Sequence, residues 1–144
     1  MNMGRILAID FGQKRVGLAV TDENRIIATA LETVRTADII PFLKGYILRE
    51  RVDFVVVGEP KQMNNTPSQA FKFVEPFIRL LTKTFPGMPV ERMDERFTSK
   101  MAFQAMIDGG LKKEERQRKE LVDSISATIL LQSYLEYCKH KERQ

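Results

Sequence analysis

The chain of 144 residues is 43% hydrophobic and 29% charged, without a biased tract. This length fits one domain over residues 1–144 and allows burial of roughly two thirds of the surface of the unfolded chain. The 23 Lys and Arg side chains outnumber the 19 Asp and Glu side chains, and the net charge of +4 favours an anionic partner.

The chain holds one cysteine, Cys138, and one histidine, His140. A single cysteine excludes an internal disulfide and any cysteine-rich zinc site. Because His140 lies in the C-terminal tail, we do not expect a hydrolase built around a histidine base. Asp10 interrupts the N-terminal apolar run before a signal-peptide core can form, and no stretch approaches the ~20 apolar residues of a membrane span. We therefore expect a cytoplasmic protein with no membrane partner.

The first half of the chain predicts four strands and one helix. Residues 5–10, 16–21 and 26–34 are rich in β-branched and apolar residues, and the short turns between them predict an antiparallel trio. Apolar residues at helical spacing predict a helix over 38–50. The continuous apolar run at 53–58 is typical of a strand that is buried on both faces.

The second half predicts a polar loop over 59–67, then a helix capped by Ser68 and a strand over 88–93. A further helix over 98–110 ends at a glycine pair. An exposed basic loop over 112–119 then leads to a last helix over 119–137. The last helix is apolar on most sides, which indicates a place in the core. The order is therefore βββ-α-β-α-β-α-α. Strands separated by helices run parallel through right-handed crossovers. We expect the α/β class, with a five-stranded mixed sheet and helices on both faces.

Acidic residues follow three of the predicted strands. Asp10 ends the first strand, Glu59 follows the fourth, and the pair Asp94-Glu95 ends the fifth. Because parallel strands end at one edge of a sheet, which is where open α/β sheets bind ligands, these acids are expected to line one crevice. Asp123, early in the last helix, is a further candidate. Carboxylates in such a crevice suit Mg²⁺ or Mn²⁺.

A pair of such ions, about 4 Å apart, stabilises the attacking and leaving oxygens of a phosphoryl displacement without a histidine base. Each acid also has a simpler interpretation. Asp10 can shape a turn, Glu59 can be a solvated loop residue, and Asp123 can favour a helix N-terminus. At least one of the pair 94–95 lacks a role in the site, because successive strand side chains point to opposite faces. Their shared edge favours the functional interpretation.

Basic residues flank the predicted acidic site. Lys14 and Arg15 lie in the turn after Asp10, and Arg96 and Lys100 follow the pair 94–95. Such side chains are suited to hold phosphates on either side of a scissile bond. The alternative to phosphate binding is that these charges form an ordinary solvated surface. For the basic loop over 112–119, this alternative is nearly as well supported as phosphate binding.

Four motifs in order resemble the YqgF family, the RuvX or Holliday-junction-resolvase-like proteins, which include pre-16S rRNA nucleases. They are IDFGQKRVGLAVTD at 9–22, VGEP at 57–60, DERFTS at 94–99 and VDSISA at 122–127. The resemblance covers almost the whole chain. It implies a ribonuclease H-like fold and a divalent-metal nuclease that matures the 5′ end of precursor 16S ribosomal RNA.

By position, the resemblance implies that Asp10, Asp94, Glu95 and Asp123 are catalytic, with Asp10, Asp94 and Asp123 as metal ligands. The chain departs from the family at Glu59, where an apolar residue is more usual. The sequence alone does not decide which of Asp94 and Glu95 faces the metal.

We therefore predict a metal-dependent endonuclease, a hydrolase of phosphodiester bonds, with Lys14, Arg15, Arg96 and Lys100 binding nucleic acid. The expected partner is precursor ribosomal RNA or branched DNA, and the chain is a monomer or a homodimer. Two alternatives stay open, a Holliday junction resolvase-like DNA nuclease and a non-catalytic RNA-binding ribosome assembly factor. The segment at 10–17 also resembles the first phosphate loop of actin- and hexokinase-type phosphotransferases, but the chain lacks their second lobe and glycine-rich adenosine loop.

Overall fold

The computed structural model describes residues 4–59, 71–94 and 119–143. In chain order the elements are β1 (Arg5–Phe11), β2 (Arg15–Thr21), β3 (Ala28–Arg35), the short 3₁₀ helix η1 (Thr36–Asp38), α1 (Ile39–Arg49), β4 (Val52–Glu59), α2 (Phe71–Thr84), β5 (Val90–Asp94) and α5 (Lys119–Arg143). The five strands form one sheet in the order β3-β2-β1-β4-β5. The predicted Ser68 cap, the helix over 98–110 and the loop over 112–118 lie outside the described residues.

The sheet is mixed, as the element order predicts. β1 pairs antiparallel with β2, and β2 pairs antiparallel with β3. β4 pairs parallel with both β1 and β5. The sheet therefore places the C-terminal ends of β1, β4 and β5 along one edge.

The start of the third strand differs from the prediction, because β3 begins at Ala28 and not at Ile26. The carboxylate of Asp22 accepts hydrogen bonds from the backbone N–H groups of Ile26 at 2.7 Å and Ile27 at 2.9 Å. Arg25, which lies between Asp22 and Ile26 in the turn, has a positive φ of 57°. These bonds hold the two isoleucines in the turn, where both side chains are exposed.

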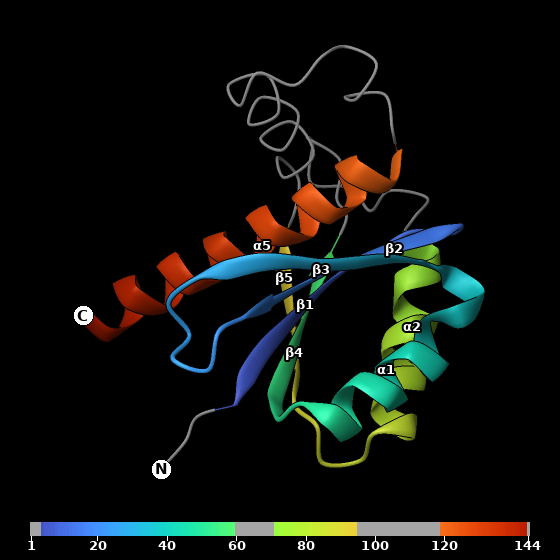
Figure 1. Ribbon diagram of the computed structural model, residues 1–144, viewed down its shortest axis with the longest axis horizontal. Helices are drawn as coiled ribbons and strands as arrows, with labels where there is room; N and C mark the ends of the chain where they lie inside the picture. The colour runs from blue at the N-terminus through green and yellow to red at the C-terminus, as the bar shows by residue number, and fades with distance from the viewer. Residues whose placement is uncertain (1–3, 60–70, 95–118, 144) are drawn as a thin grey trace.

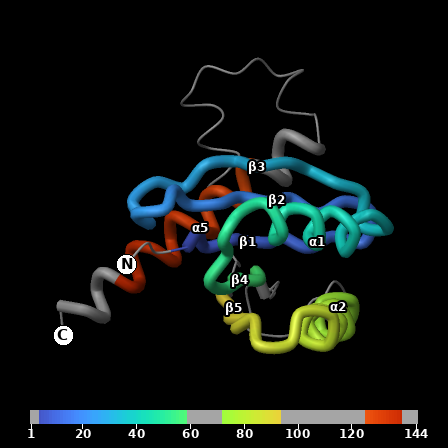
Figure 2. The backbone as a smooth tube through the Cα atoms, turned by 60° about the horizontal axis from the view of Figure 1, so that its bottom comes forward, coloured from blue at the N-terminus to red at the C-terminus, as the bar shows by residue number. Residues whose placement is uncertain are grey.

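Helices cover both faces of the sheet (Figures 1 and 2). Along β1, Leu7 and Ile9 belong to the core cluster that includes residues of α1 and α2. Ile6 and Ala8 belong to the cluster that includes residues of α5. The alternation follows from the period of two in a strand. It assigns the odd positions of β1 to the α1/α2 face and the even positions to the α5 face.

α5 is longer than predicted and is buried along one side. It continues to Arg143, six residues beyond the expected end at Tyr137. Its buried side chains recur at helical spacing and are Ser126, Ala127, Leu130, Leu131, Tyr134 and Leu135, whereas Gln132, Glu136 and Tyr137 are exposed. A helix that covers one face of a sheet buries one stripe, so the near-continuous apolar sequence overstated its burial. No helix within the described ranges is long and apolar enough to cross a membrane.

A polar cluster around Asp53 fixes the start of β1 beside β4. Its carboxylate accepts a hydrogen bond from the Gly4 N–H at 2.8 Å and pairs with Arg25 and Arg51. A Cβ at Gly4 would lie 2.4 Å from this carboxylate, so the close approach requires glycine. The Gly4 N–H, followed by Arg51, holds the pKa of Asp53 below its ordinary value of 3.8.

We predict that Asp53→Ala lowers the free energy of unfolding at pH 7 by about 1 kcal/mol, because it leaves the Gly4 N–H and Arg25 without this acceptor. The lowered pKa means that the ionised carboxylate stabilises the fold above pH 3.8. That contribution is lost as the pH falls through the lowered pKa, so the difference between the two proteins should narrow at acid pH. Urea denaturation at pH 7 and pH 3 measures the difference in free energy of unfolding between the wild type and Asp53→Ala. Asp38→Ala, at an exposed position, is the control. An equal difference at both pH values contradicts the account.

Candidate functional site

Asp10 is the acid of the candidate site whose side chain the structure places. It is half-buried near the C-terminal end of β1. As an even position, it continues the series of Ile6 and Ala8 on the α5 face. Its carboxylate therefore lies on the face of the sheet that α5 crosses, at the edge where the parallel strands end.

The strands on both sides of β1 carry small residues at the level of Asp10. In β2 its register partner is Gly17. In β4 the pair Ile9 and Val57 precedes it, so Gly58 is at the level of Asp10. Both strand neighbours of the carboxylate are thus glycines. No side chain of β2 or β4 therefore flanks Asp10 at its own level on this face of the sheet.

Glu59 and Asp94 are the last residues of β4 and β5 and are register partners. Their backbones therefore lie side by side at the same edge as the end of β1. This is the arrangement of strand ends that the sequence predicts. The side chains of these two residues are outside the described part of the structure, as is the whole of Glu95.

α5 brings the position of Asp123 to the same edge. The ring of Tyr134 contacts the ring of Phe54 at a centroid distance of 5.8 Å, and Phe54 is the register partner of Ile6. The part of α5 that precedes Tyr134 extends from this level toward the C-terminal end of β1 (Figure 1). Asp123 precedes Tyr134 by eleven residues, about 16 Å of helix, and Asp10 follows Ile6 by four residues, about 13 Å of strand.

The position of Asp123 is one helical turn before the buried Ala127 along α5. The backbone thus brings Asp10 and the position of Asp123 to the same end and the same face of the sheet. Among the side chains that the structure describes, no three His, Cys, Asp or Glu groups gather as a metal site. The placement of the strand ends and of α5 is what supports a shared acidic site.

Arg15 and Lys14 lie beside this edge. Val16 and Leu18 of β2 face α1 and α2, whereas Ala19 faces α5. The alternation puts Arg15 on the α5 face, two residues from the Gly17 that pairs with Asp10. Arg15 is half-buried there and Lys14 is exposed. Arg96 and Lys100, the other two predicted phosphate-binding residues, lie outside the described residues.

Thr36 anchors the turn that carries these two cations. Its N–H donates to the carbonyl of Lys14 at 2.9 Å, and its hydroxyl donates to the carbonyl of Gly12 at 2.7 Å. A Cβ at Gly12 would lie 2.5 Å from the carbonyl oxygen of Arg15, so this tight turn requires glycine. Two hydrogen bonds from η1 therefore position the β1–β2 turn.

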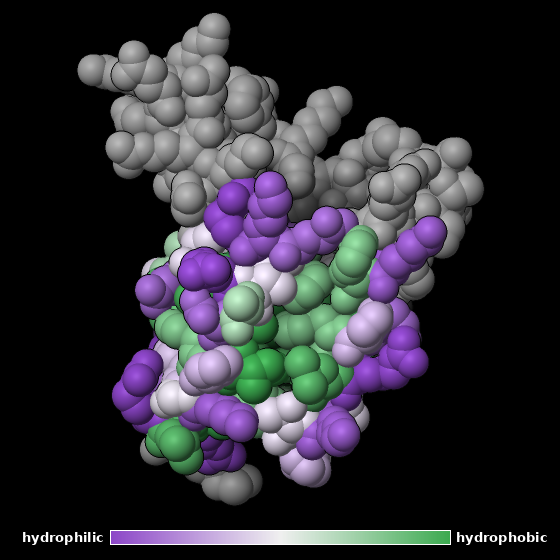
Figure 3. All heavy atoms as spheres, turned by 90° about the vertical axis from the view of Figure 1, so that its right-hand side faces the viewer, coloured by the Kyte–Doolittle hydropathy of each residue, from purple (hydrophilic) through white to green (hydrophobic). Residues whose placement is uncertain are grey.

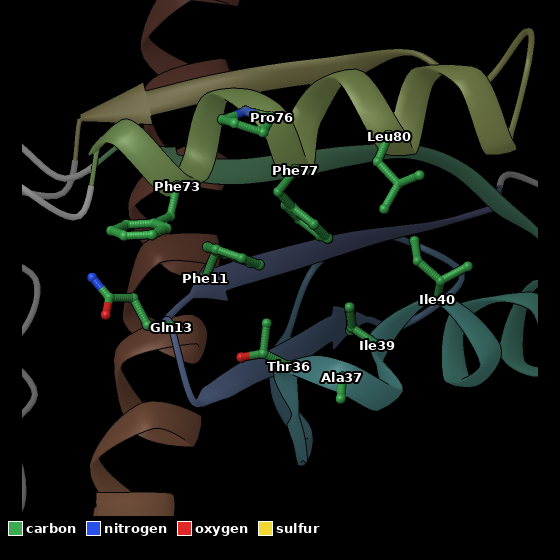
Figure 4. A pocket seen from close by; sticks show the side chains of 10 residues that line it. All are labelled: Phe11, Gln13, Thr36, Ala37, Ile39, Ile40, Phe73, Pro76, Phe77 and Leu80. Atoms are coloured by element: carbon green, nitrogen blue, oxygen red, sulfur yellow. The ribbon is translucent and has the colours of Figure 1, made fainter.

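An apolar pocket of about 580 Å³, which no sequence pattern predicted, lies on the other face of the sheet. Its lining comes from β1 and the turn after it, from η1 and α1, and from α2, as Figure 4 shows: Phe11, Gln13, Thr36, Ala37, Ile39, Ile40, Phe73, Pro76, Phe77 and Leu80. The one available sequence signal was Phe73 and Leu80, two apolar residues of α2 that fall outside its buried stripe.

Comparison with known proteins places this geometry in context. A family model described as "RuvX: Holliday junction resolvase" matches residues 4–137. A protein of Flavobacterium psychrophilum named "Putative pre-16S rRNA nuclease" is 59% identical over 133 residues, which cover 92% of this chain and 97% of that protein. A protein of Phocaeicola vulgatus with the same name is 56% identical over 138 residues, covering 96% of this chain and 99% of that protein.

Two solved structures have a similar fold. T. thermophilus RuvC in complex with a Holliday junction substrate is similar with a TM-score of 0.54 and 21% identity, over 93% of this chain and 96% of that one. The Fowlpox virus resolvase in complex with Holliday junction DNA gives a TM-score of 0.55 at 14% identity, over 93% and 98% of the two chains. At these identities the likeness concerns the fold, and it confirms the predicted ribonuclease H-like architecture.

We predict that Thr36→Val lowers the free energy of unfolding by about 1 kcal/mol, because it removes the hydroxyl that donates to Gly12. Amide hydrogen exchange in the turn at 12–15 should accelerate, because one of its two anchors is lost. Thr36→Ser keeps the hydroxyl and is the matched control. Unchanged exchange in Thr36→Val would contradict an anchoring role.

Proposed function

The chain belongs to the RuvX family of Holliday junction resolvases, and from this we propose that it is a metal-dependent endonuclease that processes the 5′ end of precursor 16S ribosomal RNA. The observation that carries the proposal is Asp10 at the common end of the parallel strands, within a chain more than half identical to named pre-16S rRNA nucleases. This substrate also implies a cytoplasmic location, consistent with the composition.

The donor set suits a hard divalent cation. We propose that Asp10, Asp123 and one acid of the pair Asp94-Glu95 hold Mg²⁺ or Mn²⁺, which carboxylate oxygens bind well. The glycines on both sides of Asp10 support this, because they place no cross-strand side chain at the level of the carboxylate. When bound, a divalent ion lowers the pKa of a water molecule and stabilises charge on a phosphodiester during its hydrolysis.

The basic residues have a separate role in the proposal. Arg15, on the same face as Asp10, is proposed to hold a phosphate beside the scissile bond, and Lys14 is proposed to hold the next phosphate along the strand. Arg96 and Lys100 are proposed to do the same from the segment that follows β5. Such contacts fix the position of a nucleic acid without reading its sequence.

The described side chains of β5 help to choose between Asp94 and Glu95. Met93 belongs to the α5 core cluster and Glu91 accepts a hydrogen bond from Tyr134 of α5, so odd positions of β5 share the face of Asp10. Arg92 instead pairs with Glu75 of α2. If the period of two continues past the described end of β5, an acid on the face of Asp10 is expected at position 95.

We predict that Asp10→Asn lowers the cleavage rate of a precursor 16S fragment at least about 100-fold while it leaves the fold intact. The amide keeps the shape of the side chain and removes the charge that a cation requires. A gel assay of single-turnover cleavage, with a thermal melt of each protein, checks this. Cleavage at the wild-type rate would exclude Asp10 from the site.

The same assay separates the alternatives when a four-way DNA junction is tested beside the RNA fragment. Preferential cutting of the junction would support the resolvase alternative. If neither substrate is cut and Asp10→Asn binds RNA as well as the wild type, the assembly-factor alternative is favoured. In that case charge reversal of Lys112, Lys113 and Arg116 should abolish binding.

We further predict that Glu95→Gln reduces cleavage more than Asp94→Asn does, by about tenfold or more. The physical reason is the alternation of side chains along β5. Parallel rate measurements on the two variants and the double variant test it. A larger loss in Asp94→Asn would assign the required acid to position 94.

A further inference from the structure

The apolar pocket has two chemically different ends. Phe73, Phe11 and Gln13 lie together at one end, and Leu80 and Ile40 lie at the other (Figure 4). Its volume of about 580 Å³ is within the range of roughly 300–1,000 Å³ that is usual for small-ligand sites. Figure 3 shows the apolar surface on this side of the molecule, ringed by hydrophilic residues.

The first end offers aromatic surface together with one polar group. Phe11 and Phe77 are stacked with their ring centroids 4.3 Å apart. Phe73, one turn before Phe77 on α2, keeps 48% of its surface exposed. Gln13 is exposed, and its side-chain amide can both donate and accept hydrogen bonds. A flat ring with donors and acceptors on its edge is the ligand that such a combination fits.

This end of the pocket also adjoins the proposed nuclease site. Phe11 follows Asp10 directly, and the two Cα atoms are about 3.8 Å apart. Their side chains lie on opposite faces at the same strand end. A nucleotide strand that passes over the end of β1 can therefore reach Asp10 with a phosphate and the pocket with a base.

The charges at this end favour a polyanion. Lys14 in the β1–β2 turn and Lys72 at the start of α2 are both exposed. The acidic Glu75 on the same helix pairs with Arg92 through two hydrogen bonds of 2.6 and 2.8 Å, so its charge is balanced. An uncharged apolar protein segment would gain nothing from the two lysines.

We propose that the end of the pocket formed by Phe11, Gln13, Phe73 and Phe77 binds one unpaired base of the nucleic acid. The inference deepens the proposed function, on which it rests, because it specifies a substrate with an unpaired nucleotide next to the cleaved bond. Stacking on the exposed ring of Phe73 tolerates any base, so the site selects for strand separation and not for sequence.

The test compares Phe73→Leu with Leu80→Ala, since the two side chains are on the same helix and are exposed to 48% and 46%. Fluorescence anisotropy in EDTA measures binding of a labelled single-stranded RNA and of a blunt duplex of the same sequence. Phe73→Leu should weaken single-strand binding roughly fivefold to tenfold, the loss expected for one stacked base. Duplex binding should not change. Leu80→Ala should bind the single strand and the duplex as the wild type does. Phe73→Tyr, which keeps an aromatic ring, should bind the single strand as the wild type does.

Single-strand binding at the wild-type level in Phe73→Leu would overturn the inference. A thermal melt of each variant shows that a loss of binding does not come from unfolding. An equal loss in Leu80→Ala would also overturn it and would point to an apolar protein segment along the whole groove. The outcome is independent of cleavage. If Asp10→Asn abolishes cutting and Phe73→Leu binds normally, the base site fails and the nuclease stands. If no substrate is cut and Phe73→Leu loses binding, the base site stands and the nuclease fails.

Discussion

Burial of β4 on both faces fixes the end of the sheet at which the candidate site is built. Val55 and Val57 face α1 and α2, Val56 faces α5, and none of the three is more than 2% exposed. β4 lies between β1 and β5, so its register sets the level of Asp10 against that of Asp94. A slip of one residue would reverse the faces of the strand and move Gly58 away from Asp10.

The end of β1 serves two different surfaces because successive side chains point to opposite faces. Asp10 is on the α5 face between two glycines, Gly17 of β2 and Gly58 of β4. Phe11 is on the α1/α2 face, stacked on Phe77 in the wall of the pocket. The hydrogen bonds of Thr36 hold the turn that follows. One short segment thus contributes to the proposed chemistry on one face and to the proposed base site on the other.

Much of the fold could be predicted from residue periodicity. The continuous apolar run at 53–58 predicted a strand buried on both faces, because this signal comes from burial itself. The strand ends carrying acids followed from the parallel order. The start of β3 could not be predicted in this way, because Ile26 and Ile27 have strand character and are held in the turn by the carboxylate of Asp22.

The pocket could not be predicted either, because its walls come from three separate parts of the chain whose packing distances no local pattern encodes. Likewise, sequence placed Asp10 and Asp123 near one edge, but the glycine neighbours of Asp10 depend on the register of three strands. For the same reason the strand pairing, and not the motif alone, distinguishes Arg15, on the face of Asp10, from Val16 beside it.

The most direct test of the account is cleavage of a precursor 16S fragment by the wild-type protein as the free Mg²⁺ concentration is varied, with excess EDTA as the zero point. If carboxylates at the ends of β1 and β5 and on α5 hold the required cation, cleavage should be absent in EDTA and should return with added Mg²⁺ or Mn²⁺. Cleavage that persists at the full rate in EDTA would contradict the account.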